Sequence, residues 1–384
     1  MELELSEEQA FFAETTRRFL ASESPLSAVR ALEHDPLGYD PAVWQRGAEL
    51  GWTSLLVEEA HGGGCFSEHG LSDLVLVAEE MGRVVAPGPL VPVNVVADAV
   101  ARLGNQAQRA AVLPRLLDGL GVAAWCGPHP CKAKPSADGG WLLSGTLPVV
   151  EAGAQSSHLL VAFRTPADHG HQVGQVLLPI DAPGLAVTPL DGLDLVRRFA
   201  SVHLHKVAIG AGDVLGPMGA PAEAEVEHQL QVACVLQCAE TVGAMSAVFE
   251  MTVEYLGDRF SFGRPLSSYQ ALKHRVADQK MWLEASHGIA TAAMRAVAAG
   301  SPDAADLVDA AKRWIGPHAT ELVQDCIQLH GGIGVTWEHD LHLYLRRTTV
   351  NRATYGTPEE HAERLAARLL AATPAATAAQ EVAS

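Results

Sequence analysis

Two kinds of periodicity alternate along this sequence, and their order restricts the fold more than any other feature. Apolar side chains recur at helical spacing over residues 1 to about 118 and again over 221–372. Between these regions, short runs rich in β-branched and aromatic residues are separated by Pro and Gly turns. The sequence therefore predicts a mainly helical α+β protein with a small antiparallel sandwich or barrel in its middle.

The same patterns set the boundaries that we expect. They predict three domains and a flexible tail, namely helical 1–118, β 119–220, helical 221–372 and the Ala-rich tail 373–384. Ser6, followed by two glutamates, is expected to cap the first helix. The C-terminal region is predicted to form a bundle of four helices or more, from helix-periodic stretches at 225–255, 270–299, 304–329 and 359–371.

Charge and composition exclude several classes of protein. The chain has 27 Lys and Arg against 45 Asp and Glu, a net charge of −18, so neither a nucleic-acid binder nor a polybasic membrane-surface protein is expected. We find no signal-peptide pattern and no apolar run of the roughly 18–20 residues that a membrane span needs. Six sparse cysteines favour a reduced, cytoplasmic protein with free thiols.

Two groups of residues with metal-binding side chains lack the partners that a metal site needs. Cys234 and Cys238 share a helix face, but no second pair or nearby histidine completes a site. His330, His339 and His342 have no carboxylate partners at ligand spacing. No metal site is therefore expected.

Two segments combine residues that suit a nucleotide cofactor. In the first, Arg259 to Leu266, a helix ends at a Gly/Pro turn and another begins; its Arg can meet a phosphate and its Phe can stack on a ring. In the second, Gln328 to Thr336, adjacent glycines let the backbone approach an anionic ligand closely. Each segment alone also fits a structural role, because Arg259 can be a helix C-terminal cation and Gly331-Gly332 a helix stop.

Together the two segments resemble the signatures of the acyl-CoA dehydrogenase family of flavoenzymes. RFSFGRPLSSYQALKHRVAD resembles the family's Arg-x-x-Phe-Gly-x-Pro…Gln…His…Ala-Asp signature, and CIQLHGGIGVTWEHDLHLYLRR resembles Gln-x-x-Gly-Gly-x-Gly. Weaker similarity extends over roughly residues 5–370. The resemblance implies a helical domain, a β-domain and a C-terminal four-helix domain, with FAD, an acyl-CoA thioester substrate, a tetramer and an acceptor such as electron-transfer flavoprotein. In this family a carboxylate removes the α-proton while the β-hydrogen leaves as hydride to flavin.

The resemblance also implies eight cofactor-binding residues. The pyrophosphate and adenosine parts of an FAD held mainly by a neighbouring subunit would contact Arg259, Ser261, Phe262 and Gln270. The ADP half of the same FAD would be lined by Gln328, Leu329, Gly331 and Gly332.

The residues that should perform the chemistry depart from the family pattern. Tyr355 stands where most members have the base Glu, and the family's second base position falls at Ala233, so we assign no catalytic residue. Glu240 and Glu250 are interpreted as ordinary helix residues. The stretches that replace the family's flavin-binding segments of the middle domain are 125–130 and 148–151.

A retained FAD edge without a base or a flavin pocket favours a heteromer. The chain is similar to the base-less β-type subunit of actinobacterial α2β2 dehydrogenases that act on steroid-side-chain CoA esters. A related subunit would then supply the base, and a bulky acyl group would be the substrate. Three alternatives stay open: a self-sufficient homomeric dehydrogenase with a relocated base, a non-catalytic acyl-CoA-binding or scaffold protein, and a flavin monooxygenase-like relative.

Overall fold

The computed structural model describes residues 5–372 except 68 and 138, so the predicted tail at 373–384 lies outside the described residues. The first region is helical, as predicted, with α1 Glu7–Glu23, α2 Leu26–Ala31, α3 Pro41–Glu49, α4 Gly70–Arg83, α5 Leu90–Leu103 and α6 Gln106–Leu117. Ser6 caps α1 as expected: its hydroxyl accepts a hydrogen bond from the Gln9 N–H at 3.1 Å, and the Gln9 side chain accepts one from the Ser6 N–H.

The middle region forms one seven-stranded sheet. Its strands are β1 Ala123–Trp125, β2 Cys131–Pro135, β3 Trp141–Glu151, β4 His158–Arg164, β5 Val173–Pro179, β6 Leu185–Leu190 and β7 Phe199–Ile209. Their order is β1-β4-β2-β3-β7-β6, with β5 on β4. The expectation of purely antiparallel pairing was wrong, because β1 and β2 both run parallel to β4. Along the chain, the long β3 follows β2 and runs antiparallel to it, so the next strand, β4, has the same direction as β2.

The C-terminal region contains five described α-helices. They are α7 Ala220–Asp258, α8 Gln270–Ala298, α9 Ala304–His330, α10 Leu341–Ala353 and α11 Pro358–Ala372. The long α7 and α9 pack against each other. The sequence periodicity had indicated four of them and not α10. The buried face of α10 includes Arg347, Thr348 and Asn351 beside its apolar residues, so no clean apolar stripe marks this helix in the sequence.

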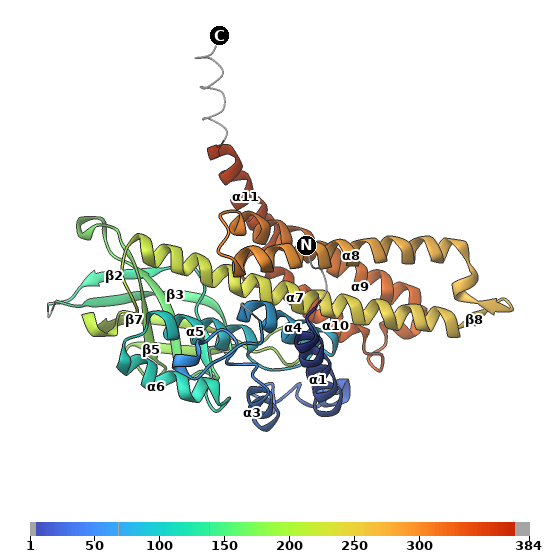
Figure 1. Ribbon diagram of the computed structural model, residues 1–384, viewed down its shortest axis with the longest axis horizontal. Coiled ribbons are helices and arrows are strands. Elements are labelled where there is room, and N and C mark those ends of the chain that lie inside the picture. Colours follow the sequence, from blue (N-terminus) through green and yellow to red (C-terminus); the bar gives the residue numbers. More distant parts are fainter. Residues whose placement is uncertain (1–4, 68, 138, 373–384) are drawn as a thin grey trace, which may run out of the picture.

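The helical regions at the two ends of the chain share one hydrophobic core. Helix α4 crosses α7 so closely that a Cβ on Gly82 would lie 1.9 Å from the Glu240 carbonyl oxygen. A Cβ on Gly243 would lie equally close to the Glu79 carbonyl oxygen. Glycine at both positions therefore lets the two backbones touch. Figure 1 shows α4 and α5 beneath α7, with the sheet at one end of the elongated molecule and β8 (Phe260–Ser261) at the other.

Helix α7 bears on the expectation that the chain has no membrane-spanning segment. By length and composition it can cross a membrane, since one 18-residue window has a mean hydropathy of 1.6. However, 89% of that window is buried inside the structure. Its hydrophobicity is therefore explained by its place in the centre of the fold, where it packs against α4, α8 and α9.

Candidate functional site

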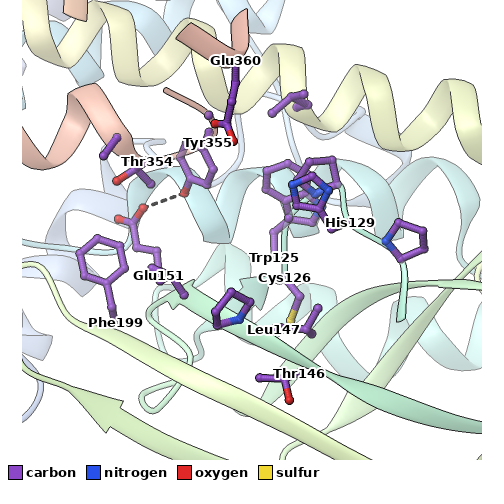
Figure 2. A pocket seen from close by; sticks show the side chains of 18 of the residues that line it. Trp125, Cys126, His129, Thr146, Leu147, Glu151, Phe199, Thr354, Tyr355 and Glu360 are labelled. Atoms are coloured by element: carbon purple, nitrogen blue, oxygen red, sulfur yellow. Dashed lines mark hydrogen bonds between the residues drawn. The ribbon is translucent and has the colours of Figure 1, made fainter. Parts of the chain in front are cut away.

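A cavity of about 1200 Å³ lies between the sheet and the junction of α10 with α11. One wall comes from the segment 125–132, and a second from β3. The third wall is the loop that contains Tyr355, together with the start of α11. Both stretches that depart from the family's flavin-binding segments, 125–130 and part of 148–151, line this cavity, as does Tyr355 (Figure 2).

The loop that carries Tyr355 is held rigidly. Tyr355 has a positive φ of 61°, a conformation that a non-glycine residue adopts only when its surroundings impose it. The buried Lys312 ammonium donates hydrogen bonds to the Thr354 carbonyl oxygen at 2.8 Å and the Asn351 carbonyl oxygen at 3.0 Å. His361 Nε2 lies 3.1 Å from the Tyr355 carbonyl oxygen. These contacts fix the phenol at one place on the cavity wall.

The phenol of Tyr355 meets a buried carboxylate in the cavity. Its hydroxyl donates a hydrogen bond of 2.7 Å to Oε2 of Glu151, the last residue of β3, which is 5% exposed (Figure 2). Burial and the Glu151 charge raise the pKa of Tyr355 well above its ordinary value. Tyr355 therefore stays protonated at neutral pH and is unsuited to act as a base.

Glu151 is also the outer member of a buried ionic network. Its Oε1 lies 3.2 Å from Arg197 Nε, and Arg197 pairs with Glu240 at 2.8 Å. Arg347 joins Glu240 to Asp194, with 2.6 Å to each carboxylate. Although burial opposes the charge, the guanidinium groups hold the pKa values of Glu240 and Asp194 below their ordinary values.

None of the other base positions offers a carboxylate to the cavity. Glu240 is held in ion pairs within the buried network. Glu250 has a side chain that is 60% exposed, and it pairs with Arg83. Ala233 is fully buried in α7, where the neighbouring Leu230 lines the cavity. The thiol of Cys234 contacts the Tyr355 carbonyl oxygen at 3.7 Å. Glu151 is thus the buried carboxylate on the wall of this cavity.

The eight predicted cofactor residues do not line this cavity. They lie where α7 and α9 end and α8 begins, around the β8–β9 hairpin (β9 is Arg264–Pro265). The hydroxyl of Tyr255 near the end of α7 donates a 3.2 Å hydrogen bond to the His330 carbonyl oxygen at the end of α9. This contact brings the ends of the two signature segments together. The two segments therefore form one surface at the end of the bundle.

Most of that surface is open. Seven of the eight residues are exposed or half-buried, whereas Leu329 is buried at 7% exposure. Phe262 is 97% exposed with a φ of 52°. Within the described part of the chain, the side chains of Arg259, Gln270 and Gln328 form no hydrogen bond or ion pair. Polar side chains and an exposed ring of this kind suit the phosphates and the purine of a nucleotide.

The cysteines and histidines of the described residues do not cluster as metal ligands would. Across residues 5–372, apart from the two left out, no three His, Cys, Asp or Glu side chains gather to hold an ion. All six cysteines are free, and burial raises the pKa of the Cys238 thiol to about 11. His330 packs against the rings of Tyr255 and His339.

Known proteins match the chain over nearly its whole length. Two family descriptions match, "Acyl-CoA dehydrogenase, N-terminal domain" over residues 6–120 and "Acyl-CoA dehydrogenase, C-terminal domain" over residues 226–370. "Acyl-CoA dehydrogenase IpdE2" of Mycolicibacterium smegmatis is 30% identical over 366 residues, covering 95% of this chain and 100% of that protein. The chain belongs to the acyl-CoA dehydrogenase family. This confirms the resemblance seen in the two signature segments.

Solved structures of acyl-CoA dehydrogenases share the fold. A variant of the "Tcur3481-Tcur3483 steroid ACAD" is 30% identical, with a TM-score of 0.84 over 96% of this chain and 99% of that one. The ChsE4-ChsE5 complex from Mycobacterium tuberculosis has a TM-score of 0.85 at 22% identity, over 96% and 99% of the two chains. The acyl-CoA dehydrogenase fold predicted from the sequence is therefore confirmed. The family consists of oxidoreductases that act on CH–CH bonds and use FAD.

Sequence reasoning missed Glu151 as a site residue. The sequence showed only that 148–151 departs from a flavin-packing segment, whereas the contact with Tyr355 spans 204 residues. An acidic residue directly after the apolar pair Val149-Val150 was the available signal. The arginines of the ionic network carried no such signal, because Arg197 and Arg347 are indistinguishable from surface arginines in a sequence.

Proposed function

We propose that this chain is the non-catalytic subunit of a heteromeric, FAD-dependent acyl-CoA dehydrogenase. A related subunit supplies the base and the flavin pocket in an α2β2 assembly, and this chain completes the FAD site across the interface. The substrate is a bulky, steroid-side-chain-like acyl-CoA thioester, and an electron-transfer flavoprotein or similar acceptor takes the electrons. We place the assembly in the cytoplasm and keep the predicted domain boundaries, 1–118, 119–220 and 221–372, as part of the proposal.

The observation that carries the proposal is the hydrogen bond between Tyr355 and Glu151. α,β-Dehydrogenation requires a base on one side of the acyl chain and the hydride acceptor on the other, with reacting atoms about 3–3.5 Å apart. Three contacts of this length separate the base from the protein wall behind the acceptor: base to acyl chain, acyl chain to acceptor, and acceptor to wall. Together they span roughly 10 Å. Here the residues at the base position and in the flavin-packing segment lie 2.7 Å apart. They meet each other instead of facing reacting groups placed between them, which supports an isoalloxazine ring held by the partner subunit and not by this chain's own cavity.

The residues at the end of the bundle have the chemistry to hold the other half of FAD, which supports the proposal. Arg259 would pair with the pyrophosphate, Phe262 would stack on the adenine, and Gln270 would bind a polar edge. Gly331 and Gly332 are exposed, and a Cβ on either would meet nothing within 4 Å. Their backbone can therefore approach an anionic ligand. FAD supplies the hydride acceptor when bound, and this chain contributes binding and orientation.

The names of the relatives agree with a paired assembly. One structure at 30% identity is named for two proteins and for a steroid substrate class. A second one, at 22% identity, is named as a complex of two proteins. Neither name assigns a partner to this chain, but both support testing co-expression with a related subunit.

The experiment measures flavin content with and without a partner. The full chain is purified alone and after co-expression with a related acyl-CoA dehydrogenase subunit from the same source, and the visible spectrum and native mass are recorded. We expect a colourless chain alone, and a yellow complex with one FAD per pair of subunits. Arg259→Ala should lower the FAD content of the complex, whereas Arg313→Ala, an exposed arginine on α9, should not. A flavin in the isolated chain that bleaches with an acyl-CoA would instead establish the self-sufficient enzyme.

A further inference from the structure

We propose that this chain's own cavity binds a neutral, largely apolar ring compound through a hydroxyl group, which donates a hydrogen bond to Glu151. The inference rests on the proposed function, because it takes the cavity to be free of flavin. It assigns the cavity a ligand class that differs from both the cofactor and the thioester. The argument depends on which hydrogen-bonding groups face the cavity, on its charge and on its size.

The hydroxyl groups around Tyr355 already donate their hydrogen bonds within the protein and present acceptor oxygens to the cavity. Tyr355 donates its hydroxyl proton to Glu151. Thr349 and Thr354, on the same wall, donate theirs to carbonyl groups one turn earlier in α10, at 2.6 and 2.9 Å. The oxygens of the carboxylate and the phenol keep unused lone pairs. A ligand hydroxyl finds acceptors for its proton here, whereas a ligand carbonyl or an isoalloxazine acceptor finds no free donor among the hydroxyls of Tyr355, Thr349 and Thr354.

The charge of the network points to the same kind of group. Three carboxylates share two guanidinium groups. Glu240 receives both arginines, and Asp194 receives Arg347 and two backbone N–H groups at 2.9 Å. Among the residues that the structure describes, Glu151 receives only Arg197 and the phenol, so the excess negative charge lies on the carboxylate that faces the cavity. A carboxylate there repels an enolate or a reduced flavin and strengthens a hydrogen bond from a hydroxyl.

The rest of the cavity suits an apolar body. Its walls include Trp125, Leu147, Phe199 and Leu230, and its volume of about 1200 Å³ exceeds what a small fragment needs. His129 lines the cavity on the side opposite Glu151 (Figure 2) and is exposed. A ligand carbonyl at the far end can therefore meet a donor or water there. A rigid multi-ring molecule with a hydroxyl at one end matches this arrangement.

A matched pair of probes tests whether the ligand must donate a hydrogen bond to Glu151. Testosterone and androst-4-ene-3,17-dione share one ring skeleton and one ketone, and differ in a hydroxyl against a ketone at the other end. Equilibrium dialysis of the full chain with each tritiated steroid gives the two dissociation constants. We expect the alcohol to bind about tenfold more tightly or better, the effect of one hydrogen bond to a charged acceptor.

Three variants show which protein group accepts the hydrogen bond from the ligand hydroxyl. Glu151→Gln removes the charge and introduces an amide donor, so the preference for the alcohol should disappear. Tyr355→Phe leaves the carboxylate in place and should keep the preference. Glu360→Gln, which removes an exposed carboxylate elsewhere on the cavity wall, should behave like the native chain. Far-UV circular dichroism checks that each variant is folded.

Several results overturn the inference. Equal binding of the two steroids, tighter binding of the ketone, or no binding of either would do so. So would a folded Glu151→Gln that keeps the preference, or a folded Tyr355→Phe that loses it. The visible spectrum of the same sample separates this failure from that of the proposed function: a flavin band in the isolated chain contradicts the heteromer, whereas a colourless chain without alcohol preference contradicts only the ligand assignment.

Discussion

Replacing Arg347 tests whether the buried ionic network holds the fold together at the cavity. Arg347 is 1% exposed and lies 2.6 Å from both Asp194 and Glu240. In Arg347→Met the side-chain volume is largely kept, but two buried carboxylates lose their common partner. Breaking a buried ion pair from one side costs about 3–5 kcal/mol. We expect a loss of this size in urea denaturation at pH 7, followed by far-UV circular dichroism.

The stability deficit of Arg347→Met should also change with pH in a definite direction. In the native chain the pKa of Asp194 is depressed, so its contribution to stability is present above the unfolded pKa and is lost as pH falls through the folded pKa. Without Arg347 the carboxylates bind protons more readily when folded, so the deficit of the variant should shrink between pH 7 and pH 5. Arg352→Met, which removes a pair with Glu359 at 40% and 68% side-chain exposure, is the control and should cost about 0–1 kcal/mol. Equal losses in the two variants, or a deficit that grows on acidification, would refute the reasoning.

Three further predictions concern other parts of the chain. Gly82→Ala should lower the free energy of unfolding by about 1–3 kcal/mol or more, seen as a lower thermal midpoint, since its Cβ would meet a backbone oxygen of α7 at 1.9 Å. Gly257→Ala, whose Cβ would meet nothing within 4 Å, should be neutral or slightly stabilising. Tyr355→Phe should cost about 1–3 kcal/mol in urea denaturation, because a buried acceptor loses its donor, and should leave turnover of the heteromer largely intact; a turnover loss of several orders of magnitude would mean that the phenol does chemistry. At pH 8, a thiol reagent should label Cys65 first, since it is the exposed cysteine and the other five are buried; more than one fast thiol would contradict the packing.

Much of the fold was readable because local patterns report local structure. Capping by Ser6 and the order of helical and β regions follow from residues a few positions apart. Helix α10 was missed because its buried face includes Arg347 and Asn351, whose partners lie on other elements. The parallel pairing of β2 with β4 was missed because register between strands about 30 residues apart leaves no mark in either strand.

The sequence by itself determined the family, the altered base position and the two signature segments, since each is a matter of residue type and spacing. It also placed Tyr355, a phenol that is a poor base at neutral pH, where most members of the family have the base Glu. Only the tertiary structure placed Glu151 against that phenol and showed that three carboxylates share two guanidinium groups. The physical reason is that burial and pairing of charges depend on side chains that the fold brings together from β3, α7, α10 and the β6–β7 connection, and no local pattern encodes which of them will meet.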